Sequence, residues 1–281
     1  MVNFLIKGFE IDRSMLKKLL THSDISQVYS STALSPEEAV ATWIIKKLGI
    51  LEGIDYGYVG NVGIKSYIPE DLKLFANRSH DLDIALENIE RIQKEYKITK
   101  DRLIDEVKYG HYRMEITYSV FNVYRIPIPT FQIGSTEYRI IDGFTTETGI
   151  GPIPLEKEDF RKINHIGYLP VLPLEVLIPS HINPRSFTYE RARRALFAAA
   201  TNHIDIHYAQ QKLEKSKEIM DRLGIGYQYK KEFKKVSIEC FRVERKVTEL
   251  ISRYYKSGSD NENVENARKV CELLRKLYER F

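Results

Sequence analysis

Two aspartates that flank one apolar residue, Asp81-Leu82-Asp83, place the strongest constraint on what this chain can fold into. Residues 80–86 are predicted to form a β-strand, and the alternation over 81–84 places Asp81 and Asp83 on one face. Leu82 and Ile84 then point to the opposite face, into a core. Two neighbouring carboxylates repel each other unless a cation neutralises them, and hard oxygen ligands suit Mg²⁺ or Mn²⁺. The pattern therefore predicts a metal site, with a merely exposed strand face as the alternative.

A glycine turn lies upstream of the aspartates. Residues 55–59 predict a short strand that ends at Gly60, and a helix is expected to follow. Free N–H groups at such a helix start bind phosphate, so Gly60 and Asn61 are candidate phosphate contacts. Arg78 and Ser79 immediately precede the aspartates and are expected to hold a triphosphate by charge and hydrogen bonding.

Helix signals dominate the first 50 residues. Ser35-Pro36-Glu37-Glu38 is a capping box with proline at the first helical position, and Gly49 is the expected stop. These signals predict a helix over about 36–48, packed through the apolar positions that recur at helical spacing.

Strand and helix patterns then alternate before the chain becomes helical. Residues 53–172 combine several strand patterns with a helical pattern over 87–107, in which Thr99 can break the helix and cap a new turn. A Gly134 hairpin turn joins two strands. We expect an α/β fold with a small mixed β-sheet flanked by helices. The expected domains are 1–172, which holds the sheet, and 173–281, which is helical.

Composition restricts the environment and the partner. The sequence contains no apolar run long enough for a membrane span, its N-terminus is charged too early for a secretory signal, and its two cysteines suggest no disulfide framework. We therefore expect a cytoplasmic protein with no membrane partner. Residues 183–281 hold 22 Lys and Arg against 14 Asp and Glu. This basic half suits a nucleic acid, although a solvated helical surface explains it equally well.

The glycine turn Gly60-Asn61-Val62-Gly63-Ile64 and the segment Arg78-Ser79-His80-Asp81-Leu82-Asp83-Ile84 resemble the DNA polymerase beta-type nucleotidyltransferase superfamily. The nearest subgroup is the abortive-infection toxin nucleotidyltransferases of toxin–antitoxin systems. The resemblance implies that an NMP moves from an NTP to a hydroxyl of RNA, such as a tRNA end, or of a protein. It implies two-metal catalysis and a cognate antitoxin protein as partner. It also implies a third carboxylate, for which Glu115 is the first candidate and Asp142 the second.

The sequence departs from that family at two points. Asn61 and Val62 replace the second glycine and the hydroxyl residue of the turn, and His181 stands where the subgroup carries a lysine. Lys65 or Arg185 is expected to supply the missing positive charge. The alternative function is therefore a catalytically degenerate nucleotidyltransferase-like protein that binds nucleic acid or a partner protein.

A histidine cluster suggests a second metal. His203, Asp205 and His207 would share one face of a strand and suit zinc. The surrounding pattern is helical, and on a helix Asp205 points away from the two histidines. Asp205 is also the one residue of this segment that resembles an acidic position of the toxin subgroup.

Overall fold

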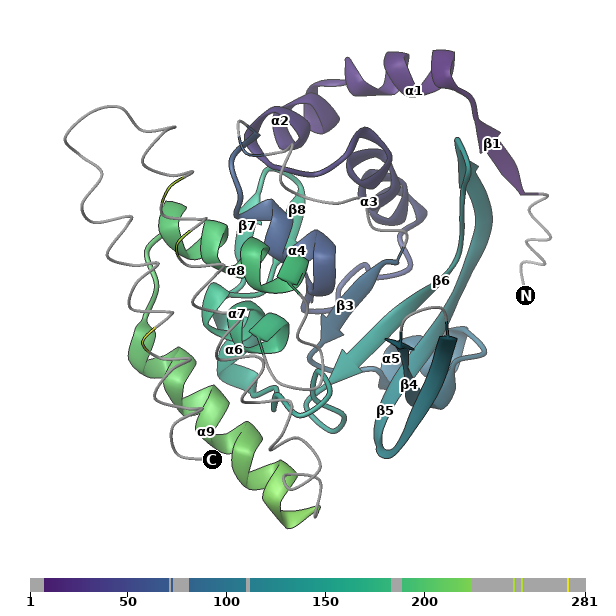
Figure 1. Cartoon of the computed structure of the whole chain (residues 1–281). Helices are drawn as coiled ribbons and strands as arrows, with labels where there is room; N and C mark the ends of the chain where they lie inside the picture. Colours follow the sequence, from purple (N-terminus) through teal and green to yellow (C-terminus); the bar gives the residue numbers. More distant parts are fainter. Residues whose placement is uncertain are drawn as a thin grey trace.

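The computed structural model describes residues 8–70, 72, 81–109, 112–182, 189–223, 245, 249 and 272, without the side chains of 103–120 and Tyr189. Strands and helices alternate along most of this part (Figure 1). The strands are β1 Phe9–Ile11, β2 Tyr56–Tyr58, β3 Asp83–Leu86, β4 Thr99–Tyr109, β5 Tyr112–Ile133, β6 Thr136–Thr145, β7 Asn164–Ile166 and β8 Leu169–Val171. The helices are α1 Arg13–Leu20, α2 Ser23–Ser31, α3 Pro36–Leu48, α4 Gly60–Ser66, α5 Glu90–Glu95, α6 Lys157–Arg161, α7 Leu174–Ile182, α8 Tyr189–Thr201 and α9 Ile206–Arg222.

The described strands form one eight-stranded mixed sheet in the order β1-β5-β6-β3-β2-β8-β7, with β4 paired to residues 112–125 of β5. Pairs β1–β5, β3–β6 and β2–β8 are parallel, whereas β2–β3, β5–β6, β4–β5 and β7–β8 are antiparallel. The predicted α/β class with a mixed sheet is therefore confirmed. β3 lies in the middle of the sheet, between β6 and β2, so any group on it is held from both sides.

Helix α3 begins and ends where its sequence signals predict. The Ser35 side chain accepts from the Glu38 backbone N–H, and the Glu38 side chain accepts from the Ser35 backbone N–H at 2.7 Å. Gly49 closes the helix with a left-handed φ of 67°. The capping box satisfies backbone groups that would otherwise have no partner.

Two sequence predictions about the sheet have different outcomes. The Gly134 turn joins β5 and β6 as expected, with a φ of 60°. The helix predicted over 87–107 is wrong, because only Glu90–Glu95 is helical and the chain then becomes β4. The antiparallel pairing of β4 with β5 satisfies its backbone, so a non-local contact overrides the local helical pattern.

The helices α7, α8 and α9 lie together on the side of the molecule opposite the long β5–β6 pair (Figure 1). Helix α4 packs against both α7 and α8, so this helical region contacts the element that follows β2 directly. Within the described residues, no helix is long and apolar enough to cross a membrane.

Candidate functional site

The start of α4 is built around the Asp83 carboxylate. Strand β2 ends at Tyr58, and the Val59 N–H donates to the Asp83 backbone oxygen at 2.9 Å. Gly60 follows with a φ of 56°, a region that favours glycine. A Cβ on Gly60 would lie 2.0 Å from Asp83 Oδ2 and 2.9 Å from Asp83 Cγ. The glycine is therefore needed both for its backbone conformation and for the space that the carboxylate occupies.

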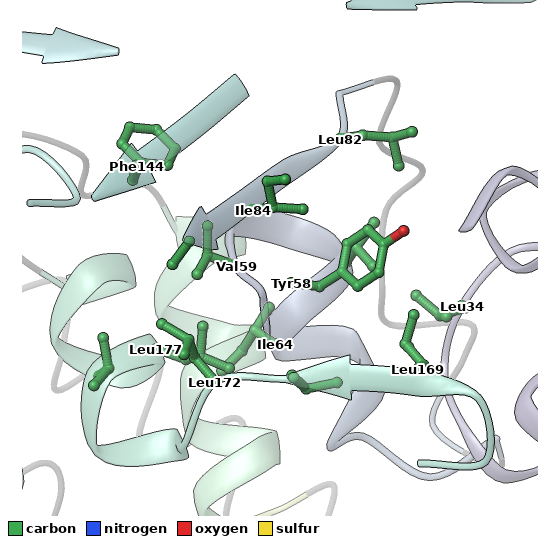
Figure 2. Close-up of a cluster of buried hydrophobic side chains, with 14 of the residues drawn as sticks. Leu34, Tyr58, Val59, Ile64, Leu82, Ile84, Phe144, Leu169, Leu172 and Leu177 are labelled. Atoms are coloured by element: carbon green, nitrogen blue, oxygen red, sulfur yellow. The ribbon is translucent and has the colours of Figure 1, made fainter. Parts of the chain in front are cut away.

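Strand β3 separates the polar site from the core as its alternation predicts. Leu82 and Ile84 are buried at 2% and 0% exposure, and both belong to the apolar cluster in Figure 2. Asp81 is exposed and Asp83 is partly exposed, on the side away from that cluster. Regular strand geometry begins only at Asp83, so the predicted strand is shorter than the pattern suggested.

A third aspartate joins this pair from the neighbouring strand. Asp142 of β6 is the in-register partner of Asp83 across a parallel pair, and its N–H donates to the Leu82 oxygen at 2.9 Å. In-register residues of adjacent strands present their side chains on the same face. Asp142, the second candidate for the third carboxylate, therefore lies beside Asp83.

Burial and neighbouring charges shift the pKa values of two of these carboxyls, Asp83 and Asp142. Burial, together with the charges of Asp142 and Asp81, raises the pKa of Asp83 to about 7. Burial also raises the pKa of Asp142, with a further contribution from Asp81. Like charges disfavour a second negative charge nearby, so this site stabilises a proton or a cation.

Two arginines oppose that repulsion. Arg125 Nη1 donates to Asp142 Oδ1, and Arg125 Nε lies 3.6 Å from Asp101 Oδ2. Arg125 and Arg191 both lower the pKa of Asp83, against the effect of burial. Sequence reasoning missed both, because Arg125 reaches the site from β5 and Arg191 from α8. The run Arg191-Ala192-Arg193-Arg194 was the one available signal.

Lys65 is committed elsewhere. Its Nζ donates to Glu38 Oε1 at 2.8 Å and to Glu38 Oε2 at 3.0 Å, and both side chains are 1% exposed. This buried ion pair joins α4 to α3 and neutralises the charge that was predicted to reach a phosphate. Asn61 lies in the first turn of α4, partly buried and next to the buried Val62.

Glu115 is not brought to the aspartates. Glu115 pairs in register with Glu106 of β4. It lies ten residues before Arg125 on β5, and Arg125 is the residue that pairs with Asp142. At about 3.3 Å per residue, that separation is roughly 30 Å along the strand. Arg78, Ser79 and Arg185 lie outside the described residues, so the structure carries no information on those three predictions.

His181 is buried in α7. Its exposure is 3%, its Nδ1 lies 3.0 Å from the Leu177 carbonyl oxygen, and burial together with Arg191 and Arg194 lowers its pKa to about 3. The imidazole is neutral at pH 7 and cannot replace the charge of a lysine, as its sequence predicted.

The described residues contain no group of three or more His, Cys, Asp or Glu side chains arranged to hold a metal ion. His203 and Asp205 precede α9, and Asp205 caps that helix by accepting from the Tyr208 N–H at 3.1 Å. The helix that was expected to run through this segment is therefore interrupted, and Asp205 has a structural role as its N-cap.

Comparisons with known proteins add little. No protein-family model matches this sequence, and no curated protein matches it significantly. The crystal structure of JHP933 from Helicobacter pylori aligns over 88% of this chain and 94% of its own, at 11% identity and a TM-score of 0.30. A similarity that weak supports no statement about fold family or activity.

Proposed function

We propose that this protein is a metal-dependent nucleotidyltransferase of the polymerase beta type, which moves an NMP from an NTP to a hydroxyl acceptor. The observation that carries the proposal is the Asp83 carboxylate held against Gly60, with Asp142 in register on the next strand. The sequence resemblance calls for this combination of a glycine turn, an Asp-x-Asp strand and a third carboxylate. In this proposal Asp142, rather than Glu115, has the third role.

The carboxylates fit a divalent cation. The charges of Asp142 and Asp81 raise the pKa of Asp83, the charge of Asp81 raises that of Asp142, and a bound cation would remove this repulsion. Mg²⁺ usually takes one or two protein carboxylates and completes its shell with substrate phosphates and water, so a closed three-ligand cage is not required. When bound, the ion would neutralise developing charge on the phosphate and favour ionisation of the acceptor hydroxyl.

The protein's own residues then orient the reaction. Asp83 is fixed by the backbone bond from Val59 and by the lack of a side chain at Gly60. Arg125 holds Asp142 in place from the adjacent strand, and Arg191 contributes positive charge from α8. These contacts give the carboxylates one fixed arrangement before a ligand arrives, which is the main requirement for phosphoryl-transfer catalysis.

A second candidate function is binding without turnover. The Arg125 ion pair already neutralises Asp142, Val62 offers no hydroxyl, and Lys65 is paired with Glu38. These features favour a degenerate scaffold that binds RNA or a partner protein, including an antitoxin. An activity measurement must therefore distinguish nucleotide transfer from binding without turnover.

The test is incorporation of label from each of the four α-labelled NTPs into total RNA or into protein, with Mg²⁺ present. Activity lost in the double variant Asp81→Ala, Asp83→Ala but kept in Asp221→Ala, an exposed aspartate of α9, supports the enzyme. Label that persists in the double variant contradicts the site assignment. No incorporation by the unmodified protein, together with RNA binding, favours the second candidate.

A further inference from the structure

Arg194 differs from the other buried charged residues of the described chain. It lies in α8 and is 5% exposed. Lys65 and Lys212, each 1% exposed, both have a buried carboxylate partner, Glu38 at 2.8 Å and Asp159 at 2.6 Å. Arg194 Nε has no hydrogen-bond partner, and Arg194 forms no ion pair with any described residue. The Nε–H of its guanidinium is therefore a buried donor that lacks an acceptor among the described residues.

Leaving a buried N–H donor without an acceptor is costly, because its desolvation is not offset by a hydrogen bond. Burial, together with the charges of Arg191 and Arg193, lowers the pKa of Arg194 to about 10. The group still carries its proton at neutral pH. Glu38 is close enough to favour that charge, but its oxygens already accept from Lys65 and from the Ser35 N–H. The described residues around Arg194 therefore include other arginines, but none of their carboxylates accepts a hydrogen bond from Arg194 Nε.

The unpaired charge is linked to the carboxylate site through Arg191. That arginine acts electrostatically on Asp83 and also on Arg194 and His181. His181 is neutral, so it does not compete with the arginines for an anion. Arg191 is therefore near enough to act both on Asp83 and on Arg194.

We propose that Arg194, in the positive field of Arg191 and Arg193, binds a phosphate or pyrophosphate group. A guanidinium presents two parallel N–H donors that match the spacing of phosphate oxygens, and several arginines together suit a ligand with more than one negative charge. Phosphate binding itself stands on the burial and missing acceptor of Arg194. Its assignment as the place where a phosphate of the NTP or the released pyrophosphate sits rests on the proposed function.

The test compares Arg194→Met with Arg222→Met, an exposed arginine of α9 that serves as the matched control. Inorganic phosphate, pyrophosphate and ATP are titrated calorimetrically at constant ionic strength with EDTA present. Binding by the unmodified protein should weaken about tenfold or more in Arg194→Met and stay unchanged in Arg222→Met. Tighter binding of ATP than of free phosphate identifies a nucleotide as the source of the group.

Stability without ligand gives an independent readout. Arg194→Met removes a buried donor that lacks an acceptor among the described residues, so the variant should unfold at a temperature equal to or above that of the unmodified protein in phosphate-free buffer. Phosphate should raise the unfolding temperature of the unmodified protein but not that of Arg194→Met, and Arg194→Lys should show a reduced rise because it lacks the two-pronged donor. A variant that unfolds earlier or fails to fold, or phosphate affinity equal in all proteins, overturns the proposal.

Failure here is distinguishable from failure of the proposed function. Phosphate binding is measured without metal and should persist in the double variant Asp81→Asn, Asp83→Asn. If the protein transfers nucleotides and Arg194→Met has unchanged phosphate affinity, the phosphate site at Arg194 is contradicted and the proposed enzymatic function stands. If phosphate binding depends on Arg194 but no nucleotide is transferred, the phosphate site is supported and the proposed enzymatic function is contradicted.

Discussion

Replacing Asp83 with asparagine should stabilise the metal-free protein at alkaline pH. The pKa of Asp83 rises from 3.8 to about 7 because of burial and the charges of Asp142 and Asp81. Each unit corresponds to about 1.4 kcal/mol, so ionising Asp83 in the fold costs about 4 kcal/mol. That figure is an upper bound, because the side chain is partly exposed and water screens the repulsion.

The sign follows from proton linkage. A carboxyl whose pKa is raised by folding stabilises the fold below pH 4, and this stability is lost as the pH rises through 7. The asparagine side chain does not titrate, so the stability advantage of the Asp83→Asn variant should grow by roughly 2–3 kcal/mol between pH 5 and pH 8. Urea denaturation at both pH values, with EDTA present, measures this difference.

The control for this prediction is Asp221→Asn, which changes an exposed carboxylate and should show no such trend. Mg²⁺ should narrow the stability gap between the unmodified protein and the Asp83→Asn variant, because the ion neutralises the carboxylates only where Asp83 is present. An Asp83→Asn variant that is less stable at pH 8, or whose advantage is the same at both pH values, refutes the electrostatic reasoning.

Three other substitutions test the scaffold around the site. Gly60→Ala should destabilise by about 2–4 kcal/mol and displace Asp83, whereas Gly134→Ala, with a similar φ but nothing within 4 Å, should cost only about 1 kcal/mol. Lys65→Met should cost about 3–5 kcal/mol by leaving Glu38 charged and buried, and adding Glu38→Gln should recover part of that loss in urea denaturation. Lys212→Met, which removes the buried contact to Asp159, should expose α9 to limited proteolysis sooner than Lys217→Met does.

Local signals accounted for the elements next to the site. The capping box of α3 and the glycine at its end depend on residues within a few positions of each other, so sequence alone predicts them. Leu82 and Ile84 likewise follow from alternation along one strand. The turn at Gly60 between a strand and a helix was also predicted, and the structure adds its positive φ.

The other features of the site depend on contacts between segments that are distant in the sequence, so local patterns do not predict them. Nothing near Lys65 in the sequence indicates that its partner is Glu38, and the register that sets Asp142 beside Asp83 arises from pairing of β6 with β3. The helix expected over 87–107 failed for the same reason, since β5 supplies the pairing that makes β4 a strand. Arg125 and Arg191 could be placed at the site only once the sheet and α8 were assembled.

The central claim is that the aspartates beside Gly60 hold a divalent cation. Its most direct measurement is Mn²⁺ binding, followed by the electron paramagnetic resonance signal of the free ion, in the unmodified protein and in Asp83→Asn. The account predicts saturable binding that weakens about tenfold or more in Asp83→Asn, tightens when ATP is added, and is unchanged in Asp221→Asn. Equal Mn²⁺ affinity in all three proteins, or no saturable binding with ATP present, would contradict it.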